Sequence, residues 1–318
     1  MPTILVTGAN GFVGRRVVSR LLDEGFRVAA FVRDAEAGAE LRMRTGADRA
    51  DAVEVRLGDI STFDTLPPAM ADLDAVIHLA AIPRDWRNGA DLRLVNTEGT
   101  RALIVAMRAA GVRRLVHMGA LGVEDDPALH YASSKAKAET LVRESGLDWT
   151  ILKPSLQFGP GDGFFNIIAD LVRWSPGLVP VPGRGDARFQ PIHVDDVARV
   201  AVAALADPTT IGESFELGGP RIWTYREITG EVLRAMDTRR VIVPMPVPLI
   251  RLVAASAEFL HLPFPVATDQ LRQLRLDNVG PLGTIPARFG FEPRDMAGQL
   301  GYLRQRTREQ GEPTRSAA

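Results

Sequence analysis

The chain has 318 residues, of which 46% are hydrophobic and 24% charged, and its formal net charge is −1. Such a balance is ordinary for a globular protein and provides no strong field for nucleic acid or anionic lipid. Because the sequence contains no cysteine, disulfides, thiol nucleophiles and thiolate metal ligands are excluded, and the five histidines lack metal-ligand spacing, so no metal site is expected.

The start of the chain predicts a cytoplasmic location. Met1 is followed almost directly by the β-branched run Thr3–Val6, without the basic segment and long apolar region of a signal peptide. The most apolar late stretch, Val241–Ala267, contains five prolines together with Arg251 and Glu258, so it does not predict a membrane span.

Apolar runs alternate with amphipathic segments through the first half of the chain. Strands are predicted at Thr3–Val6, Arg27–Val32, Ala52–Arg56, Ala75–Leu79, Arg114–Met118 and Thr150–Leu152. Helices are predicted at Phe12–Leu22, Leu92–Ala110 and Tyr131–Glu144. Such alternation implies parallel βαβ units, and right-handed crossovers then give an α/β fold with a doubly wound parallel Rossmann sheet.

The second half of the chain is less regular. A helix at Phe164–Arg173 lies in a stretch rich in Gly and Pro, whereas a helix at Val194–Ala206 and a strand at Ser214–Leu217 return to the sheet. Residues 222–304 show mostly helical patterns. The expected division is a Rossmann domain over 1–155 with 190–220 returning to it, a smaller, mainly helical substrate region over 156–189 and 221–304, and a disordered tail over 305–318.

A glycine-rich loop joins the first strand to the first helix, which is the context that a dinucleotide-binding loop requires. In this loop Gly8 permits the tight turn, Gly11 lets the backbone approach the pyrophosphate, and Gly14 lets the helix pack on the sheet. The N–H groups of the helix N-terminus attract phosphate oxygens. The predicted phosphate-binding residues are Gly8, Asn10, Gly11, Phe12, Val13 and Gly14.

The end of the second strand should select between NAD and NADP. An acidic residue there binds the ribose 2′-OH of NAD, whereas a nearby arginine suits the 2′-phosphate of NADP. The strand ends with Arg33, followed by Asp34. Because Arg33 comes first at the strand tip, we predict NADP, and NAD is the alternative if Asp34 binds the ribose.

Tyr131 and Lys135 form the predicted catalytic pair. Their spacing of four residues places both side chains on one helix face. A lysine cation beside a phenol lowers the phenol's pKa, so Tyr131 could act as a general acid or base while Lys135 also holds the nicotinamide ribose. The chain contains only three lysines and three tyrosines, which makes a chance pairing here rare.

These motifs make the sequence resemble the extended and atypical short-chain dehydrogenase/reductases. Further matches over residues 3–220 include Gly58-Asp59-Ile60, His78-Leu79-Ala80-Ala81, Asn96 with Gly99-Thr100, and Lys153-Pro154-Ser155. A closer likeness, in Leu147–Leu152 and Phe158–Phe165, is to the branch containing the nucleotide-binding accessory subunit of respiratory complex I and its bacterial relatives.

The resemblance implies further cofactor contacts. Asp59 and Ile60 would frame the adenine, and Pro154 would touch the nicotinamide. The remaining expected contacts, which include the lining of the cofactor groove, are Leu79, Ala80, Ala81, Asn96 and Met118.

One departure from the family bears on activity. The family places a catalytic Ser or Thr just after the fifth strand, but here the segment contains Gly119 and Ala120, and no hydroxyl occurs between Leu115 and Tyr131. Such a donor typically contributes about 3 kcal/mol to the transition state. We interpret His117 as a packed strand residue rather than a substitute acid.

Three functions remain open. The intact Tyr131 and Lys135 favour an NADP-dependent oxidoreductase acting on an apolar carbonyl or alcohol. Gly119 favours a non-catalytic nucleotide-binding subunit or regulator with a protein partner in a larger assembly. A nucleotide-sugar epimerase or dehydratase ranks third because it depends on the missing hydroxyl.

The expected small-molecule substrate is apolar. An almost uncharged helical pattern over Pro246–Pro265 could either pack on the core of the second half or roof the substrate pocket. If it roofs the pocket, the apolar wall of the pocket would be completed by Phe164, Phe165 and Trp174.

Overall fold

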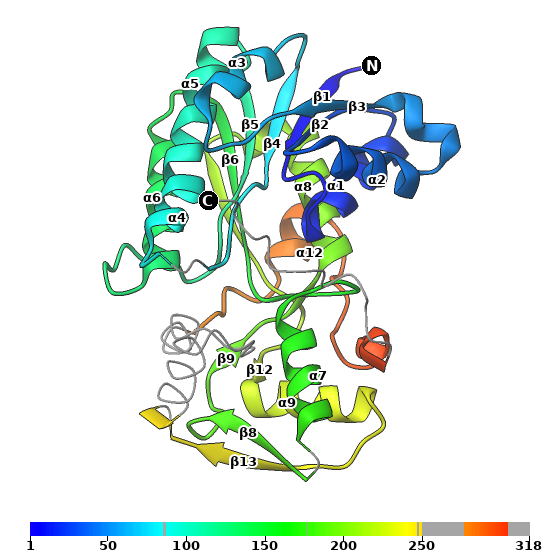
Figure 1. Ribbon diagram of the computed structural model, residues 1–318, viewed down its shortest axis with the longest axis vertical. Coiled ribbons are helices and arrows are strands. Elements are labelled where there is room, and N and C mark those ends of the chain that lie inside the picture. The colour runs from blue at the N-terminus through cyan, green and yellow to red at the C-terminus, as the bar shows by residue number, and fades with distance from the viewer. Residues whose placement is uncertain (85–86, 176, 247, 250–276, 305–318) are drawn as a thin grey trace.

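The computed structural model describes residues 1–84, 87–175, 177–246, 248–249 and 277–304. Within these residues, seven strands form one parallel sheet in the order β11-β6-β5-β4-β1-β2-β3 (Figure 1). They are β1 (Thr3–Thr7), β2 (Arg27–Val32), β3 (Val53–Leu57), β4 (Ala75–His78), β5 (Arg114–Met118), β6 (Asp148–Pro154) and β11 (Glu213–Leu217). The predicted doubly wound parallel sheet is therefore confirmed.

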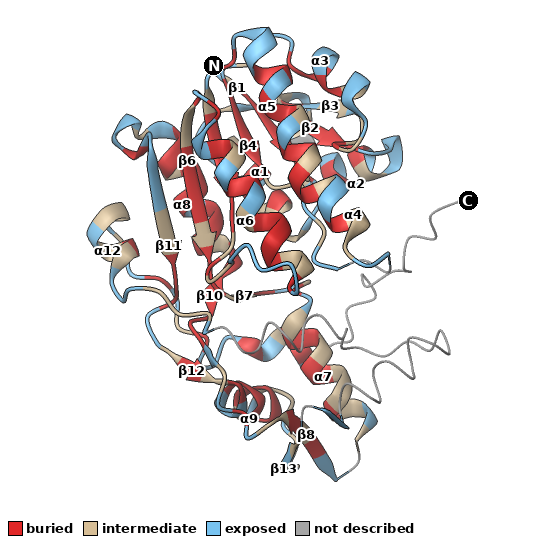
Figure 2. Ribbon diagram, turned by 90° about the vertical axis from the view of Figure 1, so that its left-hand side faces the viewer, coloured by how far each residue is buried: buried red, intermediate tan, exposed pale blue. Residues whose placement is uncertain are grey.

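The strand order locates the ligand-binding edge. After β1 the chain builds β2 and β3 on one side, and it then returns to place β4 on the other side of β1. Ligands of such sheets bind beyond the carboxyl ends of the strands at this switch point. The central strands are buried on both faces (Figure 2), which explains their almost continuous apolar sequences.

Helices cover both faces of the sheet (Figure 1). One apolar core joins the strands to α1 (Phe12–Asp23), α2 (Ala35–Thr45) and α8 (Val194–Ala206). The core on the opposite face includes α3 (Leu66–Ala69), α5 (Gly99–Ala110) and α6 (His130–Arg143). Short 3-10 turns occupy Ala47–Ala52, Phe63–Thr65, Pro208–Thr210 and Leu300–Arg304.

The helix predicted from Leu92 to Ala110 is not a uniform α-helix. It consists of α4 (Ala90–Leu92), a π-helical turn over Arg93–Glu98, and α5. Such turns insert a residue into the helical ladder and often occur at functional sites. In this chain the π-helical turn contains Asn96.

The lower part of the molecule in Figure 1 has its own apolar core, built on α7 (Phe164–Trp174) and α9 (Tyr225–Ala235). The predicted mainly helical character is incomplete, because this part also contains short strands. They are β7 (Gln157–Phe158) with β10 (Ile192–His193), β9 (Arg188–Phe189) with β12 (Trp223–Thr224), and β8 (Leu178–Pro182) with β13 (Val241–Met245). Their shortness and the prolines of β8 and β13 hide the usual strand pattern.

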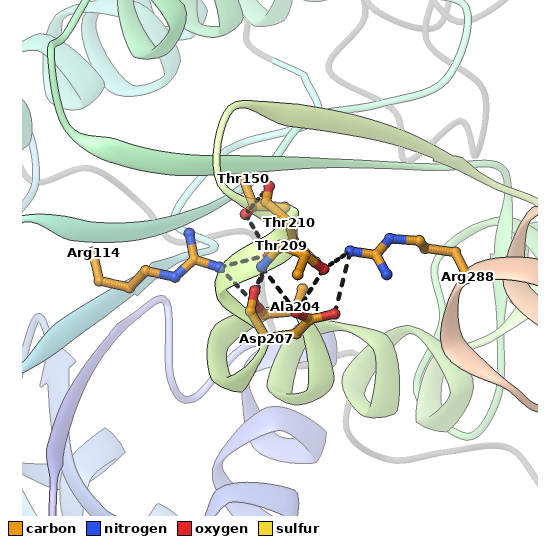
Figure 3. Close-up of polar contacts among 7 residues, drawn as sticks. All are labelled: Arg114, Thr150, Ala204, Asp207, Thr209, Thr210 and Arg288. Carbon is orange, nitrogen blue, oxygen red and sulfur yellow. Dashed lines mark hydrogen bonds and ion pairs between the residues drawn. The ribbon is translucent and has the colours of Figure 1, made fainter.

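A late segment of the chain packs back on the Rossmann sheet through α12 (Thr284–Phe289). Arg288 of this helix pairs with Asp207 at 3.2 Å and also donates to Thr209 (Figure 3). Beside them, Arg114 of β5 donates to the carbonyl of Ala204 at the end of α8. Residues 284–289 thus contact the Rossmann domain, which differs from the expected assignment of 221–304 to the substrate region.

Two sequence predictions fall outside the described residues. These are most of the helical pattern over 246–265 and the tail over 305–318. In the part of the chain that is described, no helix is long and apolar enough to cross a membrane.

Candidate nucleotide-binding and catalytic site

The glycine loop turns sharply at the carboxyl end of β1. Gly8 has a φ of +68°, which favours glycine, and its carbonyl accepts the Gly11 N–H at 3.0 Å. A Cβ at Gly14 would overlap the carbonyl oxygen of Gly8, so α1 can approach the loop this closely only with glycine there. No described side chain caps the first turn of α1 at Gly11. A loop of this shape suits the binding of phosphate oxygens by main-chain N–H groups, and phosphate binding at these residues stays a prediction.

Thr7 joins the glycine loop to the residues that follow β4. Its Oγ1 accepts the N–H groups of Leu79 and Ala80, each at 3.2 Å. The ends of β1 and β4 are thereby held together at the switch point. Leu79 and Ala80 are half-buried and Ala81 is exposed, so the three predicted lining residues lie accessible beside the loop.

The predicted adenine contacts lie after β3. The Asp59 carboxylate accepts from the N–H and the hydroxyl of Ser61, at 2.8 and 2.6 Å, which fixes this turn. Ile60 is buried, and a Cβ at Gly99 would lie 2.9 Å from its side chain. Ile60 thus packs against the start of α5.

The two candidates for cofactor selection have different surroundings at the end of β2. Asp34 is the N-cap of α2, and its carboxylate accepts the Ala37 N–H at 2.8 Å. Arg33 is exposed beside it. One carboxylate oxygen of Asp34 is therefore engaged in capping, whereas Arg33 is exposed to solvent.

Asn96 is held within the protein. Its Oδ1 accepts the Ile82 N–H at 2.9 Å, and its Nδ2 donates to the Ile82 carbonyl at 3.1 Å and to Ser134 Oγ at 3.0 Å. The side chain is 1% exposed. Asn96 therefore ties the loop after β4 to α6. The sequence had predicted a cofactor contact for Asn96 but not this structural role.

Helix α6 brings Tyr131 and Lys135 to the carboxyl end of β5. Lys135 is 4% exposed, and its Nζ donates to the carbonyl oxygen of Met118 at 2.5 Å. Burial lowers the pKa of Lys135 to about 8, although the Glu139 carboxylate opposes this shift. Met118, predicted as a cofactor contact, thus also anchors the lysine through its main chain.

The predicted lowering of the Tyr131 pKa is wrong for the chain without cofactor. Burial, reinforced by the negative charge of Glu139, raises the pKa of Tyr131 to about 12. The ammonium group that should oppose this shift is bound to the Met118 carbonyl instead. Removal from water therefore outweighs the predicted effect of the lysine.

Glu139 was missed by the sequence reasoning. It follows Lys135 by four residues on α6, is 3% exposed, and contacts Arg143 at 3.1 Å and Lys153 at 3.9 Å. A Cβ at Gly119 would lie only 2.5 Å from its Oε1. The space beside Gly119 is therefore filled by a carboxylate. The spacing of four after Lys135 was the available sequence signal.

Two buried histidines lie side by side on β4 and β5, with ring centroids 5.2 Å apart. His78 contacts Thr7 Oγ1 at 2.7 Å and Thr100 Oγ1 at 3.0 Å. His117 is 2% exposed, and neither ring nitrogen has a hydrogen-bond partner among the described residues. Burial lowers the pKa of His117 well below 6.5. The interpretation of His117 as a packed strand residue is confirmed.

The sequence matches a known protein family over the region that contains the glycine loop. A family model described as NAD(P)H-binding matches residues 8–208. The chain belongs to this family. The tight glycine loop, the absence of a described side-chain cap on α1 and the accessible residues after β4 fit such a cofactor.

Individual relatives carry different functions. A subunit of mitochondrial NADH dehydrogenase (1 alpha subcomplex subunit 9) from Arabidopsis thaliana is 28% identical over 282 residues, covering 88% of this chain and 69% of the relative. A ceramide reductase from Caulobacter vibrioides is 28% identical over 299 residues, covering 91% of this chain and 90% of the relative.

Among solved structures, a dTDP-glucose 4,6-dehydratase from Streptomyces venezuelae with NAD bound has the same fold. Its TM-score is 0.72 at 23% identity, with 95% of this chain and 96% of that chain covered.

Proposed function

We propose that this protein is an NADP-dependent oxidoreductase acting on an apolar carbonyl or alcohol. The observation that carries the proposal is the pairing of Tyr131 with the buried Lys135 on α6, at the sheet edge where the phosphate loop lies. Such a pair can supply a proton beside the nicotinamide, which a chain that only binds a nucleotide does not need. The ceramide reductase relative supports both a reductive chemistry and an apolar substrate.

The chain's own residues would manage the proton and the substrate oxygen. The bound nicotinamide would supply or accept the hydride. Tyr131 would donate a proton to the substrate oxygen, or accept one in the reverse direction. Because its pKa of about 8 lies above neutral pH, Lys135 is mainly protonated there, but its ammonium group is held by the Met118 carbonyl. The raised pKa of Tyr131 keeps the phenol protonated, which suits the donation of a proton to the substrate oxygen.

The choice of NADP rests on the end of β2. The Asp34 carboxylate caps α2, whereas Arg33 is exposed at the rim and can meet a 2′-phosphate. An NAD-specific site would instead use the second carboxylate oxygen of Asp34 to accept from a ribose hydroxyl, because only Oδ1 takes part in the cap.

The second candidate is a nucleotide-binding subunit without catalysis. It is favoured by the segment at Gly119, where a carboxylate takes the space beside the main chain and no hydroxyl is present. The Arabidopsis relative, a subunit of NADH dehydrogenase, supports a partner in a larger assembly. For either function we retain the cytoplasmic location proposed from the sequence, which cell fractionation would test.

The deciding experiment compares two Tyr→Phe variants in NADPH oxidation with a panel of apolar carbonyl compounds. Tyr131→Phe should lower kcat by about 100-fold or more, while the Kd for NADPH stays unchanged. Tyr225→Phe removes a hydroxyl from the buried core of the lower part and should leave kcat as it is. Full activity of Tyr131→Phe would remove this residue from the mechanism. Tight NADPH binding without turnover of any compound would favour the subunit.

A further inference from the structure

Three large apolar side chains are exposed together where α7 ends and where β8 and β13 begin. Trp174 is 68% exposed, Leu178 56% and Val241 62%. Leu178 and Val241 are partners in the register of the two strands, and the Val241 N–H donates to the Gly177 carbonyl at 3.1 Å. We call Trp174, Leu178 and Val241 the apolar corner. It lies at the end of the molecule remote from the Rossmann sheet (Figure 1).

The apolar corner does not result from poor packing of this part. The neighbouring β8 residues Val179 and Val181 are 1% and 0% exposed and belong to the core formed with α7 and α9. The alternation of strand side chains thus places valines inward and leaves Leu178 outward. Single exposed apolar residues are normal on a protein surface, but adjacent ones that include a tryptophan mark a contact surface.

Positive charge adjoins the apolar corner. Arg239 and Arg240 immediately precede β13, and Arg240 donates to the Ser175 carbonyl at 3.0 Å, which holds it next to Trp174. Neither arginine forms an ion pair within the described part of the chain, whereas Arg173 pairs with Asp170 at 2.7 Å. Although the whole chain carries a net charge of only −1, this corner is locally basic.

We propose that the apolar corner docks on the surface of an anionic lipid membrane. Tryptophan favours the boundary between headgroups and acyl chains, where its ring is half apolar and half hydrated. Leu178 and Val241 would enter the outer acyl region beside it, while Arg239 and Arg240 would meet lipid phosphates. The charge of these arginines favours an anionic surface over an uncharged protein partner or a second, equally basic copy of this corner.

Binding is tested by sedimentation of the full-length protein with phosphatidylcholine vesicles, with and without phosphatidylserine. We expect binding only when phosphatidylserine is present. The double variant Arg239→Gln/Arg240→Gln should weaken it about 25-fold, from roughly fivefold for each basic residue near such a surface. Trp174→Ala should weaken it as well. The matched control is Leu282→Ala, which removes a side chain that is 60% exposed away from the apolar corner and should bind like the wild type.

Fluorescence assigns the contact to the apolar corner. In a Trp86→Phe background, which removes the tryptophan outside the described residues, Trp174 emission should shift to the blue on adding phosphatidylserine vesicles. Adding Trp174→Phe should abolish the shift because Trp149 and Trp223 are far less exposed. Binding that is equal for the wild type and Trp174→Ala, or absent from both kinds of vesicle, would overturn the proposal. Dimerisation without vesicles that is lost in Trp174→Ala would assign the corner to a second copy instead. NADPH binding involves none of these residues, so the two proposals fail separately.

Discussion

The buried histidine pair allows a prediction in which two chemically identical substitutions have opposite effects. His78 and His117 lie side by side on β4 and β5, but only His78 has hydrogen-bond partners, Thr7 and Thr100. The ring nitrogens of His117 have none among the described residues. His117→Leu and His78→Leu therefore remove similar volumes from adjacent buried places and differ mainly in the hydrogen bonds that are lost.

The expected magnitudes follow from this difference. A buried polar group without a partner costs about 1–3 kcal/mol, so His117→Leu should raise the free energy of unfolding by roughly 1 kcal/mol after some loss of packing. His78→Leu gives up two hydrogen bonds worth about 1 kcal/mol each, so it should lower the free energy of unfolding by roughly 2 kcal/mol.

The pH dependence provides a second measure. Burial lowers the pKa of His78 to about 3, helped by the charge of Lys135, and lowers that of His117 well below 6.5. Because the folded-state pKa lies below the unfolded value, each histidine's contribution is complete above about pH 6.5 and is lost as the pH falls. The loss approaches about 1.4 kcal/mol per pH unit for each histidine. In each Leu variant, the free energy of unfolding should therefore depend less steeply on pH, because the contribution of one histidine is missing.

Urea unfolding at several pH values between about 5 and 7 measures both quantities. A decrease of more than about 1 kcal/mol in the free energy of unfolding of His117→Leu, with the pH slope of the wild type retained, would contradict the assignment of His117 as an unpaired group. That result would mean that the His117 ring is hydrogen-bonded in the folded protein, through an ordered water, and is not an unpaired group.

Further substitutions test the nucleotide site. Arg33→Ala should abolish the preference for NADPH over NADH in calorimetry, whereas Asp34→Ala should keep it and only lower stability by about 1 kcal/mol through loss of the α2 cap. Gly14→Ala should eliminate NADPH binding in the same assay, because its Cβ would overlap the loop backbone. In NADPH oxidation, Ala120→Ser should raise kcat if the missing hydroxyl limits the rate, but Gly119→Ser should not, because a carboxylate fills the space beside Gly119. An equal gain from both would show that this carboxylate moves aside.

Local patterns in the sequence were sufficient for the main sheet and for the phosphate loop. Strands buried on both faces must be almost continuously apolar, and a loop that turns at Gly8 and packs α1 at Gly14 has few alternatives to glycine. The pairing of Tyr131 with Lys135 was equally readable, because two side chains four residues apart on a helix share a face. Each of these features depends on residues that are only a few positions apart in the chain, so the sequence alone was sufficient to predict them.

Tertiary structure decided what surrounds those residues. Glu139 reaches the main chain at Gly119, and Asn96 bonds to Ile82 and Ser134, only because α6 and the π-helical turn pack on the same sheet edge. The pKa of Tyr131 is raised because removal from water depends on all the neighbours that exclude it, whereas the spacing of four concerns one neighbour only. Contacts between distant segments depend on how whole elements pack, and no periodicity within one element encodes them.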